Sequence, residues 1–244
     1  MKLQDELKAS GEELGLSLFG VADVTRARDF VLAQGGEHLK AFPKALSLGV
    51  RLLDAVVDEL YRHEDPSVIY TYRGLYNSAN ANLDRSALLM AKRVQEAGFR
   101  AYPIPASQTV NSRRLAGAFS HKLAANLGGL GWIGRSCLLI TPDHGPRVRL
   151  ATVLTDAPLE PGEPMPNGCG ECRRCVEICP AKAFTGVSFN AAEPRDVRFR
   201  AQLCKDYTDR REHLMGEGLC GLCVYICPHG SKGKANPAVR SSTL

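Results

Sequence analysis

The sequence has little of what membrane-spanning, secreted or disordered chains need. Among its 244 residues, no apolar run approaches the roughly 20 residues that a membrane-spanning helix requires. The first six residues carry charges of both signs and lack the apolar core of a signal peptide. Apolar residues make up 44% of the chain and charged residues 23%, which excludes a disordered or fibrous protein. We therefore expect a globular, cytoplasmic protein with no membrane partner, built as one large domain or as a medium domain with a small appendage.

Cysteine, by contrast, is abundant and concentrated in one part of the chain. Eight of the nine cysteines lie between Cys169 and Cys227. In a reducing compartment, clustered cysteines indicate metal binding rather than disulfides. The ninth, Cys137, lies in an apolar stretch, where we expect a buried thiol that acts as a small hydrophobic side chain.

The spacing of the eight cysteines favours two [4Fe–4S] clusters. The first run is C-x2-C-x2-C-x3-C followed by Pro180, the bacterial ferredoxin pattern, in which three close thiolates bind one cluster and the fourth binds the other. A pair of zinc sites is the alternative, but zinc knuckles usually come as two separated pairs. The crossing rule predicts two ligand sets: Cys169, Cys172, Cys175 and Cys227 for cluster one, and Cys179, Cys204, Cys220 and Cys223 for cluster two.

The net charge of +5 suggests a nucleic-acid partner only weakly. Two four-iron clusters, each with a core charge of about +2 and four thiolates, would add about −4 together. The loaded protein would then be close to neutral, so we give the basic balance little weight.

Hydrophobic periodicity predicts alternating helices and strands up to about residue 157, which is typical of an α/β layer domain. A stretch with four prolines, from Ala157 to Gly168, then reads as a linker or a rigid loop. We expect an α/β (α+β) domain over residues 1–157, a ferredoxin-like double-cluster domain over 158–229 and a flexible tail over 230–244. The predicted helices are the N-terminal segment, 80–97 and 115–127, and the predicted strands are 18–22, 45–50, 100–104, 136–140 and 148–155.

One segment before the cysteines carries a family resemblance. Gly129 to Arg135 (GLGWIGR), Thr155 to Leu159 (TDAPL) and the double run of cysteines resemble epoxyqueuosine reductases, a group that shares its cobalamin-binding fold with reductive dehalogenases. The match is specific from Gly129 to Pro228 and looser in the N-terminal half. The resemblance implies a cobalamin-binding-like domain fused to the double-cluster domain, with electrons passing through the clusters to the cobalt. The implied cofactor-binding residues are Gly131, Trp132, Ile133 and Gly134.

The sequence also departs from that family. Counting back from Gly129 without gaps, Leu115 stands where epoxyqueuosine reductases carry an aspartate proton donor. The sequence also stops soon after the second cysteine run, without the tRNA-holding helical extension of long members. From both departures we expect tRNA to be an unlikely partner.

Two other residues are candidate proton donors. His121 precedes the glycine-rich segment and could protonate a product or hydrogen-bond a corrin side chain, although an exposed polar position is the alternative. Tyr76 belongs to a cluster of tyrosines and could donate a proton as in reductive dehalogenases, although such tyrosines more often pack with the hydroxyl at the surface.

The functional prediction is therefore a cobalamin-dependent, iron–sulfur oxidoreductase. A ferredoxin or flavodoxin would supply low-potential electrons, and an unidentified small molecule would be the substrate. The alternatives are an electron carrier or reductive activator of a partner protein, and an epoxyqueuosine reductase acting on tRNA. An electron carrier needs only about 60 to 80 residues around its clusters. The 157 residues before the linker argue against this alternative, because we expect them to enclose a ligand-binding cavity.

Overall fold

The computed structural model describes residues 2–230 and divides them into two compact units. Unit 1 contains the residues up to 51 together with 77–132 and 148–166, and unit 2 contains 52–76, 133–147 and 167 onward. We expected a division at residue 157, with each domain continuous in the sequence. In the structure, residues 52–76 and 133–147 belong instead to the unit that contains the clustered cysteines. Of the expected tail, only Gly230 lies within the described residues.

Unit 1 is built on a four-stranded antiparallel sheet. Its strand order is β1 (Leu18–Asp23), β2 (Lys44–Arg51), β6 (Val148–Thr155) and β3 (Ala101–Ile104). Four of the five predicted strands are thereby confirmed. Because β2 and β6 are central, nearly all their side chains are buried, which explains why both read as continuous apolar runs.

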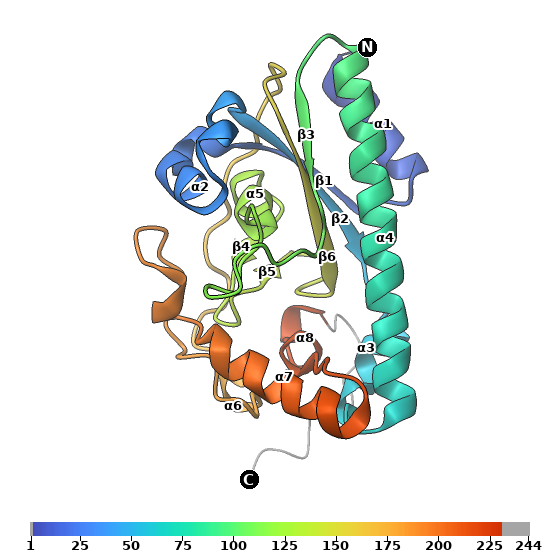
Figure 1. The fold of residues 1–244 in the computed structure, drawn as a ribbon, viewed down its shortest axis with the longest axis vertical. Coiled ribbons are helices and arrows are strands. Elements are labelled where there is room, and N and C mark those ends of the chain that lie inside the picture. The colour runs from blue at the N-terminus through green and yellow to red at the C-terminus, as the bar shows by residue number, and fades with distance from the viewer. Residues whose placement is uncertain (1, 231–244) are drawn as a thin grey trace. The chain divides into compact units, whose positions relative to one another are not determined.

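Helices cover both faces of this sheet (Figure 1). One face packs against α1 (Leu3–Glu13) and the C-terminal part of α4 (Pro66–Glu96), through a core that includes Leu46, Leu83 and Met90. The other face packs against α2 (Arg28–Gly35) and α5 (His121–Leu127). Alternate residues of one strand therefore enter different cores, as Val153 and Leu154 of β6 do.

Helix α4 begins well before the predicted start at residue 80. The Asp65 side chain accepts a hydrogen bond from the Ser67 backbone N–H at 2.9 Å, and Pro66 occupies the first helical position. This cap was visible in the sequence and was missed. The predicted end is confirmed, since Gly98 adopts a φ of +88° and its N–H bonds back to Gln95.

Two predicted elements are shorter than expected. Helix α5 begins only at His121, because Ser120 caps it and residues 107–118 form a loop in which Leu115 has a φ of +48°. Strand β5 covers only Leu139–Ile140, because Cys137, with a φ of +54°, lies in a tight turn. The apolar period of the sequence does not reveal either left-handed residue.

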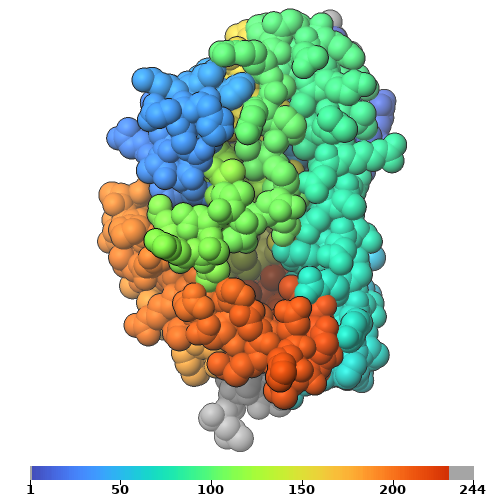
Figure 2. Space-filling model, in the orientation of Figure 1, coloured from blue at the N-terminus to red at the C-terminus, as the bar shows by residue number. Residues whose placement is uncertain are grey.

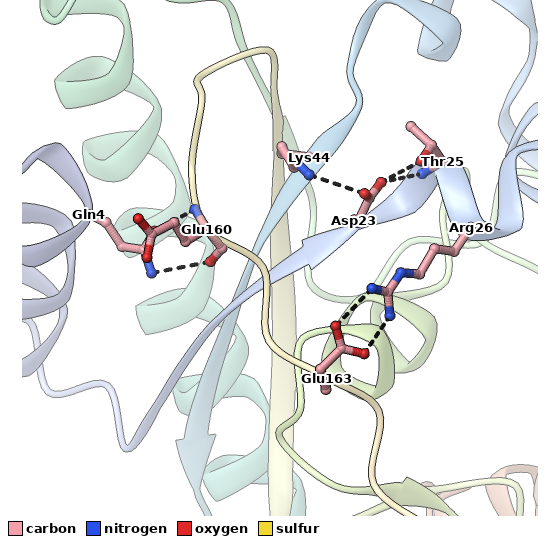
Figure 3. A network of polar contacts seen from close by, with 7 residues as sticks. All are labelled: Gln4, Asp23, Thr25, Arg26, Lys44, Glu160 and Glu163. Carbon is pink, nitrogen blue, oxygen red and sulfur yellow. Dashed lines mark hydrogen bonds and ion pairs between the residues drawn. The ribbon is translucent and has the colours of Figure 1, made fainter.

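The proline-rich stretch after β6 is a fixed loop rather than a free linker. Arg26 forms a two-pronged ion pair with Glu163 at 2.7 and 2.8 Å, and the Gln4 side chain exchanges hydrogen bonds with the backbone of Glu160 (Figure 3). The Gly162 N–H also donates to the Val21 carbonyl at 2.9 Å. The loop that follows β6, up to Pro166, therefore belongs to unit 1.

Unit 2 contains short helices around the cysteines. They are α3 (Asp54–Asp58), α6 (Arg174–Glu177), α7 (Ala201–Met215) and α8 (Leu222–Tyr225), with 3-10 turns η3 (Glu59–Arg62), η4 (Arg195–Val197) and η5 (Pro228–Gly230). Unit 1 has the 3-10 turns η1 (Val24–Ala27) and η2 (Glu37–Ala41), and β4 (Trp132–Ile133) pairs with β5. No helix among the described residues is long and apolar enough to cross a membrane.

Candidate functional site

The first three cysteines group with the last one. Burial, and then the neighbouring thiols of Cys169 and Cys172, raise the pKa of Cys175 to about 11. Burial, and then the same three thiols, raise the pKa of Cys227 to about 12. Thiols influence one another in this way only when they are close in space. Cys227, more than fifty residues away in the sequence, therefore lies with the first run.

The other four cysteines form a second group. Burial raises the pKa of Cys204 to about 11, with contributions from Cys179 and Cys220. The pKa of Cys223 is raised by burial and then by Cys220, Cys204 and Cys179, with Cys175 of the first group last. Cys179 is itself buried, and its Sγ accepts a hydrogen bond from the Ala183 N–H at 3.4 Å. Cys179 therefore lies near Cys204 and Cys223, and the ligand sets given by the crossing rule stay a prediction.

The donor set fits iron–sulfur clusters. None of the nine cysteines is in a disulfide. A buried thiolate needs a cationic partner, and a cluster of core charge about +2 is such a partner for four thiolates. Among residues 2–230, no three His, Cys, Asp or Glu side chains are placed to hold a single bare metal ion.

The glycine-rich segment reaches the first cysteine group at Gly134. A Cβ built on Gly134 would lie 2.8 Å from Ile140 Cγ1 and 3.3 Å from Cys169 Sγ. The Gly134 N–H donates to the Leu138 carbonyl, and its own carbonyl accepts from the Cys137 N–H. Because Gly134 has no side chain, its backbone can lie close to the predicted cluster ligand Cys169. Cys137 is 4% exposed, which confirms the prediction of a buried thiol.

The three residues before Gly134 are held inside the protein. Trp132 and Ile133 are both buried. Gly131 is fixed by the buried Asn126, whose side-chain N–H donates to the Gly131 carbonyl at 3.0 Å. Their predicted part in cofactor binding stays a prediction.

His121 is occupied by two internal hydrogen bonds. Its Nε2 lies 2.9 Å from the Pro105 carbonyl, which can only accept, so Nε2 carries the proton. Its Nδ1 then accepts from the Thr152 hydroxyl at 2.8 Å. Burial lowers the pKa of His121 to about 4, although the bond to Pro105 acts in the opposite direction. The ring is therefore neutral at pH 7 and ties the loop before α5 to β6, and neither nitrogen is left to protonate a substrate.

The loop before α5 exposes a basic surface. Residues 107–114 are all exposed, including Arg113 and Arg114, and the loop lies at the surface in Figure 2 (light green). Leu115 lies at the end of this loop, not on a helix. The predicted helix over 115–127 was therefore wrong at its start, and a residue count along a loop does not fix where the Leu115 side chain points.

Tyr76 lies on α4 within unit 2, partly buried. It lies close to Arg73 of the same helix, whose pKa is raised first by its hydrogen bond to Glu217. Its role as proton donor stays a prediction.

Several buried charges near the cysteines were not predicted. Arg73 forms a two-pronged ion pair with Glu217, which is 4% exposed and precedes Cys220 by three residues. Arg147 is 2% exposed and pairs with Asp54 and Asp58 at 3.0 and 2.7 Å. Arg147 immediately precedes β6, and its side chain is buried rather than solvated. Nothing in the local sequence marks these residues, because their partners are 89 or more residues away.

Comparison with known proteins confirms the cluster domain. Residues 168–230 match the family model described as a 4Fe-4S double cluster binding domain. This range contains all eight clustered cysteines, and it decides for two [4Fe–4S] clusters over the zinc alternative.

Curated relatives match the chain over about half to two thirds of its length. The epoxyqueuosine reductase of Listeria monocytogenes is 29% identical over 64% of this chain and 41% of its own. The epoxyqueuosine reductase of Bacillus subtilis is 32% identical over 48% of this chain and 31% of its own length. The epoxyqueuosine reductase of a Synechococcus species is 34% identical over 49% of this chain and 38% of its own length. The chain thus spans less than half the length of these relatives.

Solved structures share the fold. An epoxyqueuosine reductase with an epoxyqueuosine-modified tRNA stem loop has a TM-score of 0.62 at 18% identity, covering 96% of this chain and 66% of that one. A catabolic reductive dehalogenase with 3-bromo-4-hydroxybenzoic acid has a TM-score of 0.66 at 18% identity, covering 94% of this chain and 32% of that one.

These comparisons overturn two expectations. An unidentified small substrate was the leading functional prediction, and tRNA was held to be an unlikely partner. The matching relatives are named epoxyqueuosine reductases, and one matching structure of that enzyme contains a tRNA stem loop. Both expectations were wrong, and the findings favour the alternative that we ranked lower. The resemblance of this chain to the epoxyqueuosine reductase-like, double-cluster group, which shares its fold with reductive dehalogenases, is confirmed.

Proposed function

We propose that this chain is the redox portion of a cobalamin-dependent reductase that acts on epoxyqueuosine in tRNA. The observation that carries the proposal is the sorting of eight cysteines into two groups of four, with Gly134 of the glycine-rich segment against Cys169. Two clusters in one small unit suit one-electron steps, and the curated relatives that match this chain are named epoxyqueuosine reductases.

Cobalamin is proposed as the cofactor because a matching dehalogenase structure, 19% identical with a TM-score of 0.65, is described with a mechanism for B12-dependent dehalogenation. When bound, cobalamin supplies a cobalt centre that passes electrons to the substrate. The donor chemistry of unit 1 suits the amide-rich rim of a corrin, since Asn80 and Arg149 are partly buried and joined by a 3.0 Å hydrogen bond. His121 does not act as a cobalt ligand, because both of its nitrogens are engaged.

The charge around the loop before α5 suits a tRNA substrate. Residues 97–142 contain five Lys or Arg and no Asp or Glu. Arg113 and Arg114 are exposed within it. Phosphate contacts of this kind supply much of the affinity for nucleic acids, so the basic loop offers a place for the stem loop backbone.

Opening an epoxide also requires a proton for the departing oxygen. Leu115 has none to give, and the His121 ring is held by internal bonds. Tyr76 is the candidate that remains from the sequence, and Tyr76→Phe removes its proton with little change in shape.

The test is turnover of an epoxyqueuosine-containing anticodon stem loop by anaerobically reconstituted protein with cobalamin and a strong low-potential reductant. We expect formation of queuosine, and a loss of about a hundredfold or more in Tyr76→Phe, the scale typical of a missing general acid. The matched control is Tyr70→Phe, a tyrosine that is 50% exposed. Full loading of clusters and cobalamin without any queuosine would contradict the proposal.

A further inference from the structure

Arg211 is a buried cation that forms no ion pair with a carboxylate among the described residues. It lies on α7, and the residue is 6% exposed. Its Nε donates to the Leu219 carbonyl at 3.2 Å and its Nη2 to the His63 carbonyl at 2.5 Å. Two other arginines of unit 2 differ, because Arg73 pairs with Glu217 and Arg147 with two aspartates.

The rings beside Arg211 are neutral. The Tyr207 ring lies 5.8 Å from the guanidinium, and the Tyr207 hydroxyl is 3.2 Å from His63 Nε2. Burial lowers the pKa of His63, and the charge of Arg211 lowers it further, so this ring is neutral. Glu64 acts weakly on both rings through its charge, but its own side chain is exposed to solvent. A buried cation with only neutral partners is costly unless an anion stands close by.

That anion is the second cysteine group. Leu219, which accepts from Arg211, is bonded directly to Cys220. Arg211 also lies close enough to Cys220 for its charge to act on the Cys220 sulfur. The Tyr207 ring beside Arg211 lies near the same sulfur. A four-iron cluster with four thiolates carries a net charge of about −2, which becomes about −3 on reduction.

We propose that Arg211 is a positioning and charge-balancing residue that raises the reduction potential of cluster two. Net charge and hydrogen bonding around a cluster set its potential, and a nearby cation favours the more negative, reduced state. The proposal rests on the crossed ligand sets and is independent of the substrate.

The experiment is a redox titration of the anaerobic, two-cluster protein followed by paramagnetic resonance. Cys172→Ala and Cys220→Ala, each lacking a ligand of one cluster, assign the signals. In Arg211→Gln, we expect the ratio of reduced to oxidised cluster two at a fixed potential to fall about tenfold, which is 59 mV for one electron. Cluster one serves as the internal reference and should not move.

Two further variants separate charge from shape. Arg210→Gln is the matched control, because Arg210 is the next residue of the same helix and is exposed. Arg211→Lys keeps the charge but loses the forked hydrogen bonds. Its cluster-two potential should stay near the wild-type value, with a shift much smaller than that of Arg211→Gln. If Arg211→Gln cannot hold cluster two, Arg211→Met, which also removes the charge but keeps an unbranched side chain, takes its place and should show the same fall.

Three results would overturn the proposal. They are an unchanged potential in Arg211→Gln, an equal shift in Arg210→Gln, or a shift in Arg211→Lys as large as the tenfold effect expected for glutamine. Absence of cluster two from the wild type would instead refute the ligand sets on which the proposal rests.

Discussion

His121 gives this protein a pH dependence of stability that can be calculated from its surroundings. Burial lowers the pKa of the folded ring to about 4, against 6.5 for an ordinary histidine. The ring is neutral in both states at pH 8. As the pH falls through 6.5, the unfolded chain takes up a proton that the folded chain refuses, so the stability present above pH 6.5 is progressively lost until about pH 4.

The magnitude follows from proton linkage. One pH unit below the unfolded pKa, at pH 5.5, the loss is about 1.4 kcal/mol relative to pH 8. This is an upper value, because the ring keeps some exposure to solvent. A glutamine in place of His121 can still donate to the Pro105 carbonyl and accept from Thr152, but it does not titrate, so His121→Gln should lack this loss.

The assay is urea unfolding of the cluster-loaded protein under anaerobic conditions at pH 8.0 and pH 5.5. We expect the free energy of unfolding of the wild type to drop by about 1.4 kcal/mol more than that of His121→Gln. His38→Gln, at an exposed histidine, is the control and should behave as the wild type. Equal pH dependence in the wild type and His121→Gln would refute the account of a neutral, internally bonded ring.

Three further predictions concern the cysteine unit. Anaerobically prepared protein should contain about eight irons and eight sulfides, and stoichiometric zinc without acid-labile sulfide would contradict this. Gly134→Ala should make cluster one decay faster under a chelator than cluster two, because its Cβ would press on Cys169 Sγ and Ile140. Gly74→Ala, on α4 with open space around it and no left-handed φ, is the control for an added methyl, and equal decay of both clusters in Gly134→Ala would refute the contact. Glu217→Gln should lower the free energy of unfolding by about 3 kcal/mol. This is the low end of the cost of removing one partner of a buried ion pair, because the Arg73 side chain is 36% exposed. A loss below about 1 kcal/mol in chemical unfolding would show that the pair contributes little.

The sequence predicted those parts of the fold and the site that depend on local spacing. The strands over residues 18–22, 45–50 and 148–155 follow from continuous apolar runs, and the cluster ligands follow from gaps of two and three residues between cysteines. The start of α4 was missed although Asp65 and Pro66 form a recognisable cap, because the hydrophobic repeat is clearest only from residue 80.

What could not be predicted depends on contacts between distant residues or on single backbone angles. Arg147, Glu217 and Arg211 read as ordinary surface charges until the fold brings their partners to them. The left-handed conformation of Leu115 shortens α5 without any break in the apolar repeat. The wrong judgement on tRNA rested in part on a gapless residue count back to Leu115, which lies in the loop before α5.

The central claim is that the eight cysteines form two crossed sets, so that the chain carries two distinct four-iron clusters. The most direct measurement compares the paramagnetic resonance spectra of reduced Cys179→Ala and Cys227→Ala with those of Cys220→Ala and Cys172→Ala. We predict that Cys179→Ala resembles Cys220→Ala, with cluster two lost, and that Cys227→Ala resembles Cys172→Ala, with cluster one lost. The reverse pairing, with Cys179→Ala resembling Cys172→Ala, would contradict the account.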